Sequence, residues 1–91
     1  MKTAAETAAA IKALFNEHDV HRARISEKTI KAIACIEPEA EEILHVRYMT
    51  EVINELSLIG ILCGQLPRGG YGLITTSNLE GAKVILFKTE I

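Results

Sequence analysis

The sequence has no long apolar run and only two cysteines, and each shortage excludes a class of protein. No uninterrupted apolar stretch approaches the roughly 18 residues of a membrane-spanning helix, so we expect no membrane partner. Cys35 and Cys63 lie far apart, in apolar stretches, and do not form a zinc-binding pattern. We interpret both cysteines as small buried apolar residues, and we expect no cofactor.

Catalytic motifs are also missing. The stretch GQLPRGGYGLITTS at residues 64–77 holds four of the six glycines, but no lysine stands near it and β-branched residues follow, so it does not match a P-loop. No carboxylate pair stands apart from the run EPEAEE at residues 37–42, and the spacing suggests no serine–histidine–aspartate set. His18 and His21 could share a helix face, but no third metal ligand is spaced to join them. We therefore predict that the chain is not an enzyme and has no catalytic residues, no metal site and no small-molecule substrate.

The remaining composition is that of one globular domain. The 91 residues are 48% apolar and 24% charged, which suffices for a single core over residues 1–91 but not for two. Residues 1–15 place apolar groups at helical spacing and lack the continuous apolar segment of a signal peptide, so we expect a cytoplasmic location.

The charge is weakly acidic overall but unevenly distributed. A net charge of −2 does not favour nucleic-acid binding, because phosphate neutralisation supplies most of the non-specific affinity. However, the segment RARISEKTIK at residues 22–31 contains four basic residues and one acidic residue, whereas residues 37–42 contain four glutamates. This separation of charge is compatible with a basic surface formed by residues 22–31.

Apolar spacing predicts helices in the first two thirds of the chain. Residues 3–17 form the first, and the stretch NEHDVHRAR at residues 16–24 is expected to be a connection. Ser26 is a good N-cap for a short second helix, which Pro38 is expected to end.

A third helix is expected to run to Leu58, in one piece or two, with Gly60 as a left-handed stop. The residues predicted for its apolar face are Met49, Val52, Ile53, Leu56 and Ile59. Those predicted for its outer face are Arg47, Glu51, Asn54 and Leu58.

After Gly60 the pattern becomes strand-like. The runs ILCGQL, GLITT and KVILFK are separated by the turn sequences PRGG and NLEGA. The predicted class is α+β, with three helices, or four if the third one breaks, followed by a small antiparallel β-hairpin or sheet. This order is the layout of a winged helix-turn-helix, in which the third helix enters the major groove and the hairpin, or wing, touches the DNA backbone or the minor groove.

Two segments add a more specific resemblance. The sequences RYMTEVINELSLIGIL at residues 47–62 and PRGGYG at residues 67–72 resemble the C-terminal winged-helix domain of the archaeal origin-recognition and cell-division-control initiators. The family's recognition helix begins with basic residues and ends in a hydrophobic-Leu-Gly-Ile sequence, a pattern matched by Arg47, Thr50, Glu51, Ile53, Glu55, Leu56, Gly60 and Ile61. The Arg-Gly-Arg-Tyr-Gly-like wing tip resembles residues 68–72, although Gly70 replaces its second arginine and Tyr48 stands where a base is common. The resemblance implies a DNA-binding role in replication initiation, and transcription regulation is the other DNA-binding role that we consider.

We expect contacts to double-stranded DNA from three parts of the chain. The third helix would supply Arg47, Tyr48, Thr50 and Asn54. The wing would supply Arg68, Gly69, Gly70 and Tyr71, and the connection and second helix would supply Arg22, Arg24, Lys28 and Lys31.

The alternative is a winged helix that assembles with protein and does not bind DNA. Leu58 is an apolar residue on an otherwise polar helix face, which often marks a protein contact. The alanine-rich first helix could pack against a second copy in a homodimer, although packing within one chain explains it equally well.

Overall fold

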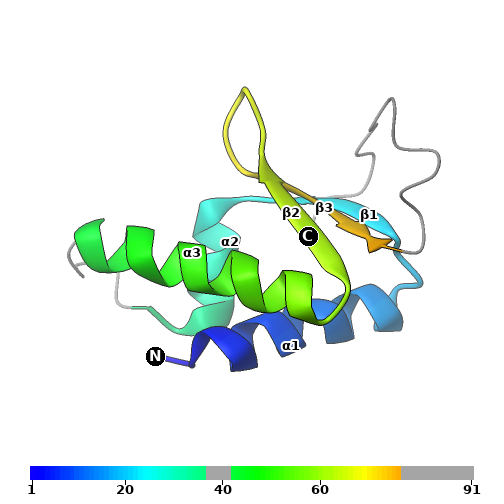
Figure 1. The fold of residues 1–91 in the computed structure, drawn as a ribbon, viewed down its shortest axis with the longest axis horizontal. Coiled ribbons are helices and arrows are strands. Elements are labelled where there is room, and N and C mark those ends of the chain that lie inside the picture. The colour runs from blue at the N-terminus through cyan, green and yellow to red at the C-terminus, as the bar shows by residue number, and fades with distance from the viewer. Residues whose placement is uncertain (37–41, 77–91) are drawn as a thin grey trace.

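The computed structural model describes residues 1–36 and 42–76. The elements along the chain are α1 (Ala4–Glu17), β1 (Arg22–Ile25), α2 (Glu27–Ala34), α3 (Glu42–Leu58), β2 (Ile61–Gln65) and β3 (Tyr71–Thr75) (Figure 1). Three helices and a small antiparallel sheet confirm the predicted α+β class, in a layout consistent with a winged helix. Pro38 and the predicted strand KVILFK at residues 83–88 lie outside the described residues.

The first helix begins with a reciprocal cap. The Thr3 hydroxyl accepts a hydrogen bond from the Glu6 amide at 3.1 Å, and the Glu6 carboxylate accepts one from the Thr3 amide at 3.0 Å. These bonds hold the pKa of Glu6 below its ordinary value, since they stabilise the charged carboxylate. Ile11 and Phe15 follow at helical spacing and are buried in the core.

The prediction of a connection over residues 16–24 is wrong at its end, because Arg22–Ile25 forms strand β1. Ala23 and Ile25 are buried, and Arg22 and Arg24 alternate with them toward the other face of the sheet. The strand is too short for this alternation to be a clear signal, and its hydrogen-bonding partner is β3, far along the chain.

Helix α2 starts as predicted and ends earlier than predicted. The Ser26 hydroxyl accepts from the Thr29 amide at 3.0 Å, which confirms the N-cap. The helix ends at Ala34, because Cys35 takes the left-handed conformation with φ of 57°, so the stop does not depend on Pro38. Cys35 is exposed, which corrects its interpretation as a buried residue, and Cys63 is half-buried.

Helix α3 is continuous over its described length and packs its apolar face inward. Met49, Val52 and Leu56 are buried, as the spacing predicts. Gly60 follows the helix with φ of 90°, which confirms it as a left-handed stop.

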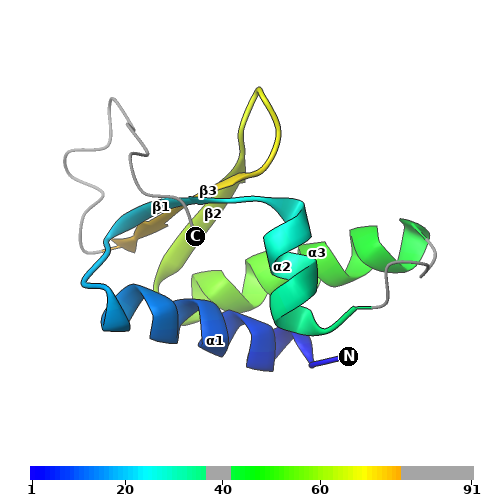
Figure 2. The ribbon, with the colours of Figure 1, turned by 180° about the vertical axis from the view of Figure 1, so that it is seen from behind.

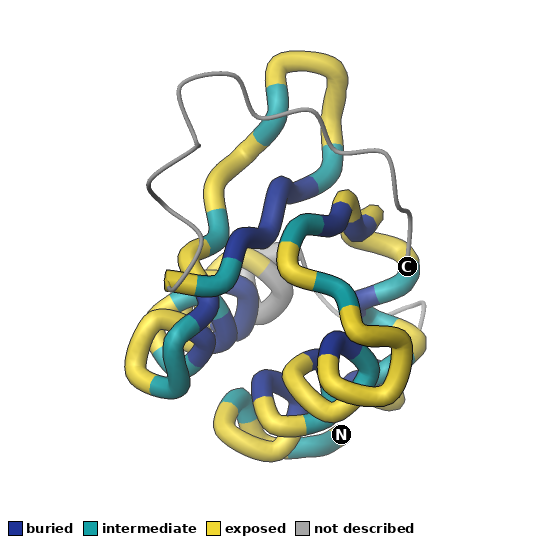
Figure 3. Tube along the Cα trace, turned by 90° about the vertical axis from the view of Figure 1, so that its right-hand side faces the viewer, coloured by how far each residue is buried: buried dark blue, intermediate teal, exposed yellow. Residues whose placement is uncertain are grey.

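The sheet has the order β1-β3-β2, with antiparallel pairing throughout. Helices α1 and α3 run beneath it in the view of Figure 1 and again in the reverse view of Figure 2. Leu73 of the central strand β3 pairs with both Ala23 and Cys63 and is fully buried. Figure 3 shows that burial is concentrated on this strand and on the helix faces below it, whereas the tip between β2 and β3 is exposed.

Candidate nucleic-acid interface

The loop that joins β2 to β3 projects from the body of the molecule (Figures 1 and 3). We call residues 66–70 the wing tip. It is closed by two backbone hydrogen bonds of 3.0 Å, from the Leu66 amide to the Gly70 carbonyl and from the Gly69 amide to the Leu66 carbonyl. Arg68 is exposed at the tip, so its guanidinium is presented to solvent by a hydrogen-bonded turn.

The two glycines of the tip have different roles. Both have positive φ, 95° at Gly69 and 75° at Gly70. A Cβ atom at Gly69 would meet no atom within 4 Å, whereas one at Gly70 would lie 3.0 Å from the Ile25 carbonyl oxygen. Gly70 therefore lets the wing approach the end of β1.

That approach creates a pocket of about 430 Å³ between the wing, β1 and the start of α2. Figure 2 shows the wing standing above the junction of β1 and α2. Among the residues that the structure describes, those that line the pocket are Arg24, Ile25, Ser26, Thr29, Arg68, Gly69 and Gly70.

The pocket is suited to an anion. Two guanidinium groups line it, and none of the lining residues within ranges 1–36 and 42–76 is acidic. The Ser26 and Thr29 hydroxyls lie 2.8 Å apart on its wall, at the N-terminus of α2, where the helix dipole also favours negative charge. The sequence prediction included both arginines but missed the two hydroxyls, for which the only signal was the capping serine two residues after Arg24.

The sheet register places both arginines of β1 on the face that points away from the helices. Arg24 lies opposite Gly72, which in turn lies opposite Gly64, so the two neighbouring strands carry no side chain beside it. Arg22 lies opposite Ile74 and is half-buried. Arg24 is thus the more accessible of the two.

The two predicted lysines of α2 differ in their surroundings. Lys28 is exposed in the first turn of the helix. Lys31 forms an ion pair with Glu27 at 3.4 Å, one turn away. This pairing offsets part of the positive charge that Lys31 would bring to the surface.

Helix α3 presents a mixed face to solvent. Arg47, Thr50 and Asn54 are exposed, as predicted, together with Glu51. The Thr50 hydroxyl donates to the Val46 carbonyl at 3.0 Å, so it is already hydrogen-bonded within its own helix.

Tyr48 is in the core, and we remove it from the predicted DNA contacts. Its exposed fraction is 6%. Its hydroxyl donates to the Lys2 carbonyl at 2.8 Å and therefore accepts from the Thr7 hydroxyl, which is also buried. The ring thus connects α3 to the start of α1, and it has no access to a groove.

Tyr71 also departs from the prediction. It lies on the helix-facing side of β3, opposite Ile25 and Gln65, and it is buried. Stacking of this ring on a sugar is excluded by its position, so Arg68 and Gly69 are the exposed members of the four predicted wing contacts, and Gly70 is half-buried.

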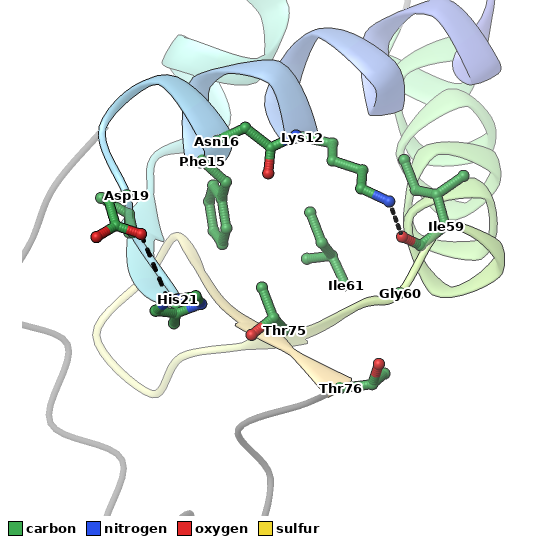
Figure 4. A pocket seen from close by; sticks show the side chains of 11 residues that line it. Lys12, Phe15, Asn16, Asp19, His21, Ile59, Gly60, Ile61, Thr75 and Thr76 are labelled. Atoms are coloured by element: carbon green, nitrogen blue, oxygen red, sulfur yellow. Dashed lines mark hydrogen bonds and ion pairs between the residues drawn. The ribbon is translucent and has the colours of Figure 1, made fainter.

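A second pocket, of about 420 Å³, lies at the other end of β1 (Figure 4). Phe15 and Ile61 form an apolar floor, and Lys12 stands at one side with its ammonium donating to the Ile59 carbonyl at 2.8 Å. At the opposite side, His21 lies 3.7 Å from the Asp19 carboxylate. These charged groups are engaged within the chain, and we assign no ligand to this pocket.

Across residues 1–36 and 42–76, no cluster of three histidine, cysteine, aspartate or glutamate side chains is placed to hold a metal ion. No helix in the same ranges combines the length and the apolar character needed to cross a membrane. Comparison of the chain with protein-family models, with curated proteins and with solved structures finds no match.

Proposed function

We propose that the chain is a winged-helix protein that binds double-stranded DNA. The observation that carries the proposal is the pocket in which Arg24 of β1 and Arg68 of the wing stand together beside the capped start of α2. Arginine binds phosphate oxygens through two parallel hydrogen bonds, and phosphate contacts account for half or more of protein–DNA hydrogen bonds. The resemblance of residues 47–62 and 67–72 to archaeal initiator domains supports the same class of function, with a role in replication initiation.

A low net charge does not oppose this proposal, because association depends on the local field. The basic side chains of β1, the first turn of α2 and the wing belong to elements that meet at the pocket. The nearby acid Glu27 is paired with Lys31. A patch of this kind attracts a polyanion even when the whole chain is weakly acidic.

The test is fluorescence anisotropy of the full chain with a labelled duplex of about 30 base pairs of mixed sequence, over a salt series. We expect affinity to fall steeply with salt, and we expect Arg24→Ala and Arg68→Ala each to lower the slope of log K against log salt by about 1. Lys12→Gln removes one positive charge at the distant pocket and is the matched control, which should keep the wild-type slope. Absence of binding by the wild-type chain at low salt would refute the proposal.

Protein assembly is a second candidate, favoured by two exposed apolar residues on α3. Leu58 is 79% exposed and Val46 is 62% exposed. Exposed apolar side chains mark a protein contact where they belong to a contiguous patch. Sedimentation velocity of the wild-type chain and of Leu58→Ser tests this function, which requires an oligomer that the substitution dissociates.

A further inference from the structure

We infer, resting on the proposed DNA-binding function, that DNA lies across the side of the molecule formed by β1, the start of α2 and the wing, and that α3 stays outside the major groove. We call this side, with Arg22, Arg24, Lys28 and Arg68, the wing-side surface. One backbone phosphate occupies the pocket between Arg24 and Arg68. This arrangement competes with the expectation that the third helix enters the major groove.

The first argument is the separation of charge. In the part of the chain that the structure describes, the wing-side surface carries four basic residues, and the one acid in the first turn of α2, Glu27, is paired with Lys31. On the outer face of α3, the positive charge of Arg47 is offset by the negative charge of Glu51. Glu55, one turn further on, is half-exposed and adds a second negative charge. A helix in the major groove lies within about 10 Å of phosphates of both strands, a distance comparable to the Debye length at 0.1 M salt. Carboxylates on that helix are therefore repelled by the DNA.

The second argument is the shortage of groups on α3 that could read bases. Tyr48 is buried, and the Thr50 hydroxyl is bonded to the Val46 carbonyl. Arg47 and Asn54 remain from the predicted set. The exposed Val46 and Leu58 would also have to lie near a polar groove.

The third argument is the shape of the wing-side pocket. Gly69 carries no side chain at the tip, and even a Cβ atom there would meet nothing within 4 Å, so an incoming phosphate meets no steric barrier at this point. Arg24 and Arg68 line the pocket from two different elements, and because the Ser26 and Thr29 hydroxyls share one hydrogen bond, one of the two keeps a proton to donate. A pocket of this chemistry recognises the phosphodiester group and not the base, so binding is expected to be nearly independent of sequence.

The experiment compares four variants of the full chain with the wild type by anisotropy at about 0.1 M salt, where the Debye length of about 10 Å limits each charge to nearby phosphates, with folding checked by circular dichroism. Arg24→Ala and Arg68→Ala remove the pocket cations, Glu51→Gln and Glu55→Gln neutralise α3 in a double variant, and Arg47→Ala with Asn54→Ala removes its base-reading groups. We expect each pocket variant to weaken binding about tenfold, and both α3 double variants to stay within about twofold of the wild type.

The outcomes separate the two proposals. A gain of affinity in the glutamine variant, or a loss in the Arg47→Ala/Asn54→Ala variant, places α3 in the groove and overturns the inference while DNA binding stands. Unchanged DNA affinity in both Arg24→Ala and Arg68→Ala also overturns the inference. No binding by the wild-type chain removes the proposed function itself, whatever the variants do.

Discussion

Replacement of Tyr48 by phenylalanine should destabilise the fold without changing DNA affinity. The hydroxyl donates to the Lys2 carbonyl at 2.8 Å and accepts from the buried Thr7 hydroxyl. The Lys2 amide in turn donates to the Ala34 carbonyl at 2.8 Å, so this hydroxyl is one member of a chain of bonds that joins α3, the N-terminal residues and the end of α2.

The expected cost is about 2 kcal/mol of unfolding free energy, because a buried polar group left without its partner costs about 1–3 kcal/mol. For a domain of this size, that loss lowers the melting temperature by about 10 °C. Urea denaturation followed by circular dichroism measures the difference. Thr7→Val should be destabilising too, and the double variant should cost about 1 kcal/mol less than the sum of the single ones, since both substitutions remove one shared hydrogen bond.

Tyr71→Phe is the matched control for this experiment. Tyr71 is buried to a similar extent, but within the described residues its hydroxyl has no hydrogen-bonding partner. Removal of the Tyr71 hydroxyl should change the free energy of unfolding by no more than about 0.5 kcal/mol. A Tyr48→Phe cost no greater than that of Tyr71→Phe would refute the reasoning, and a loss of DNA affinity at unchanged stability would return Tyr48 to the interface.

Three further predictions concern the wing and the cysteines. Gly70→Ala should lower the free energy of unfolding by about 1–3 kcal/mol, and by more than Gly69→Ala does. Both glycines have positive φ, but only at position 70 would a Cβ atom lie 3.0 Å from the Ile25 carbonyl oxygen. Equal losses of stability in thermal unfolding would contradict this close approach. Burial raises the pKa of the Cys63 thiol from 9.0 to about 11, which favours the neutral thiol in the folded chain. The resulting stabilisation is complete below pH 9 and is lost between pH 9 and about 11, so the wild type should lose stability relative to Cys63→Ala over that interval in urea titrations. The exposed Cys35 should react with iodoacetamide at pH 8 well before Cys63, and equal rates would argue against this burial.

The elements that local sequence defines were predicted well. The cap at Ser26, the apolar face of α3 and the left-handed Gly60 each depend on residues within one or two turns. Strand β1 was missed because its pairing energy comes from β3, and four residues are too few for alternation to be distinguished from a connection. Arg24 lies in β1 and Arg68 in the loop between β2 and β3, far apart in the sequence. Local sequence patterns therefore could not predict that both would line one pocket.

The burial of Tyr48 is predictable from the spacing of the helix. Tyr48, Val52 and Leu56 are spaced by one helical turn, which places the ring on the buried side of α3. The resemblance, in which a base is common at this position, instead favoured a DNA contact. The burial of Tyr71 was harder to foresee, because it depends on the register of β3 against β1 and β2.

The wing contact links stability to the proposed function in a way that the Tyr48 bonds do not. Gly70 allows the tip to approach Ile25, and the same approach brings Arg68 to the pocket that Arg24 lines. A side chain at position 70 must therefore push the two guanidinium groups apart as well as strain the turn. Gly70→Ala should lose DNA affinity together with stability, whereas Tyr48→Phe should lose stability alone. If both variants were equally destabilised and kept full DNA affinity, the phosphate would have to bind elsewhere than between β1 and the wing.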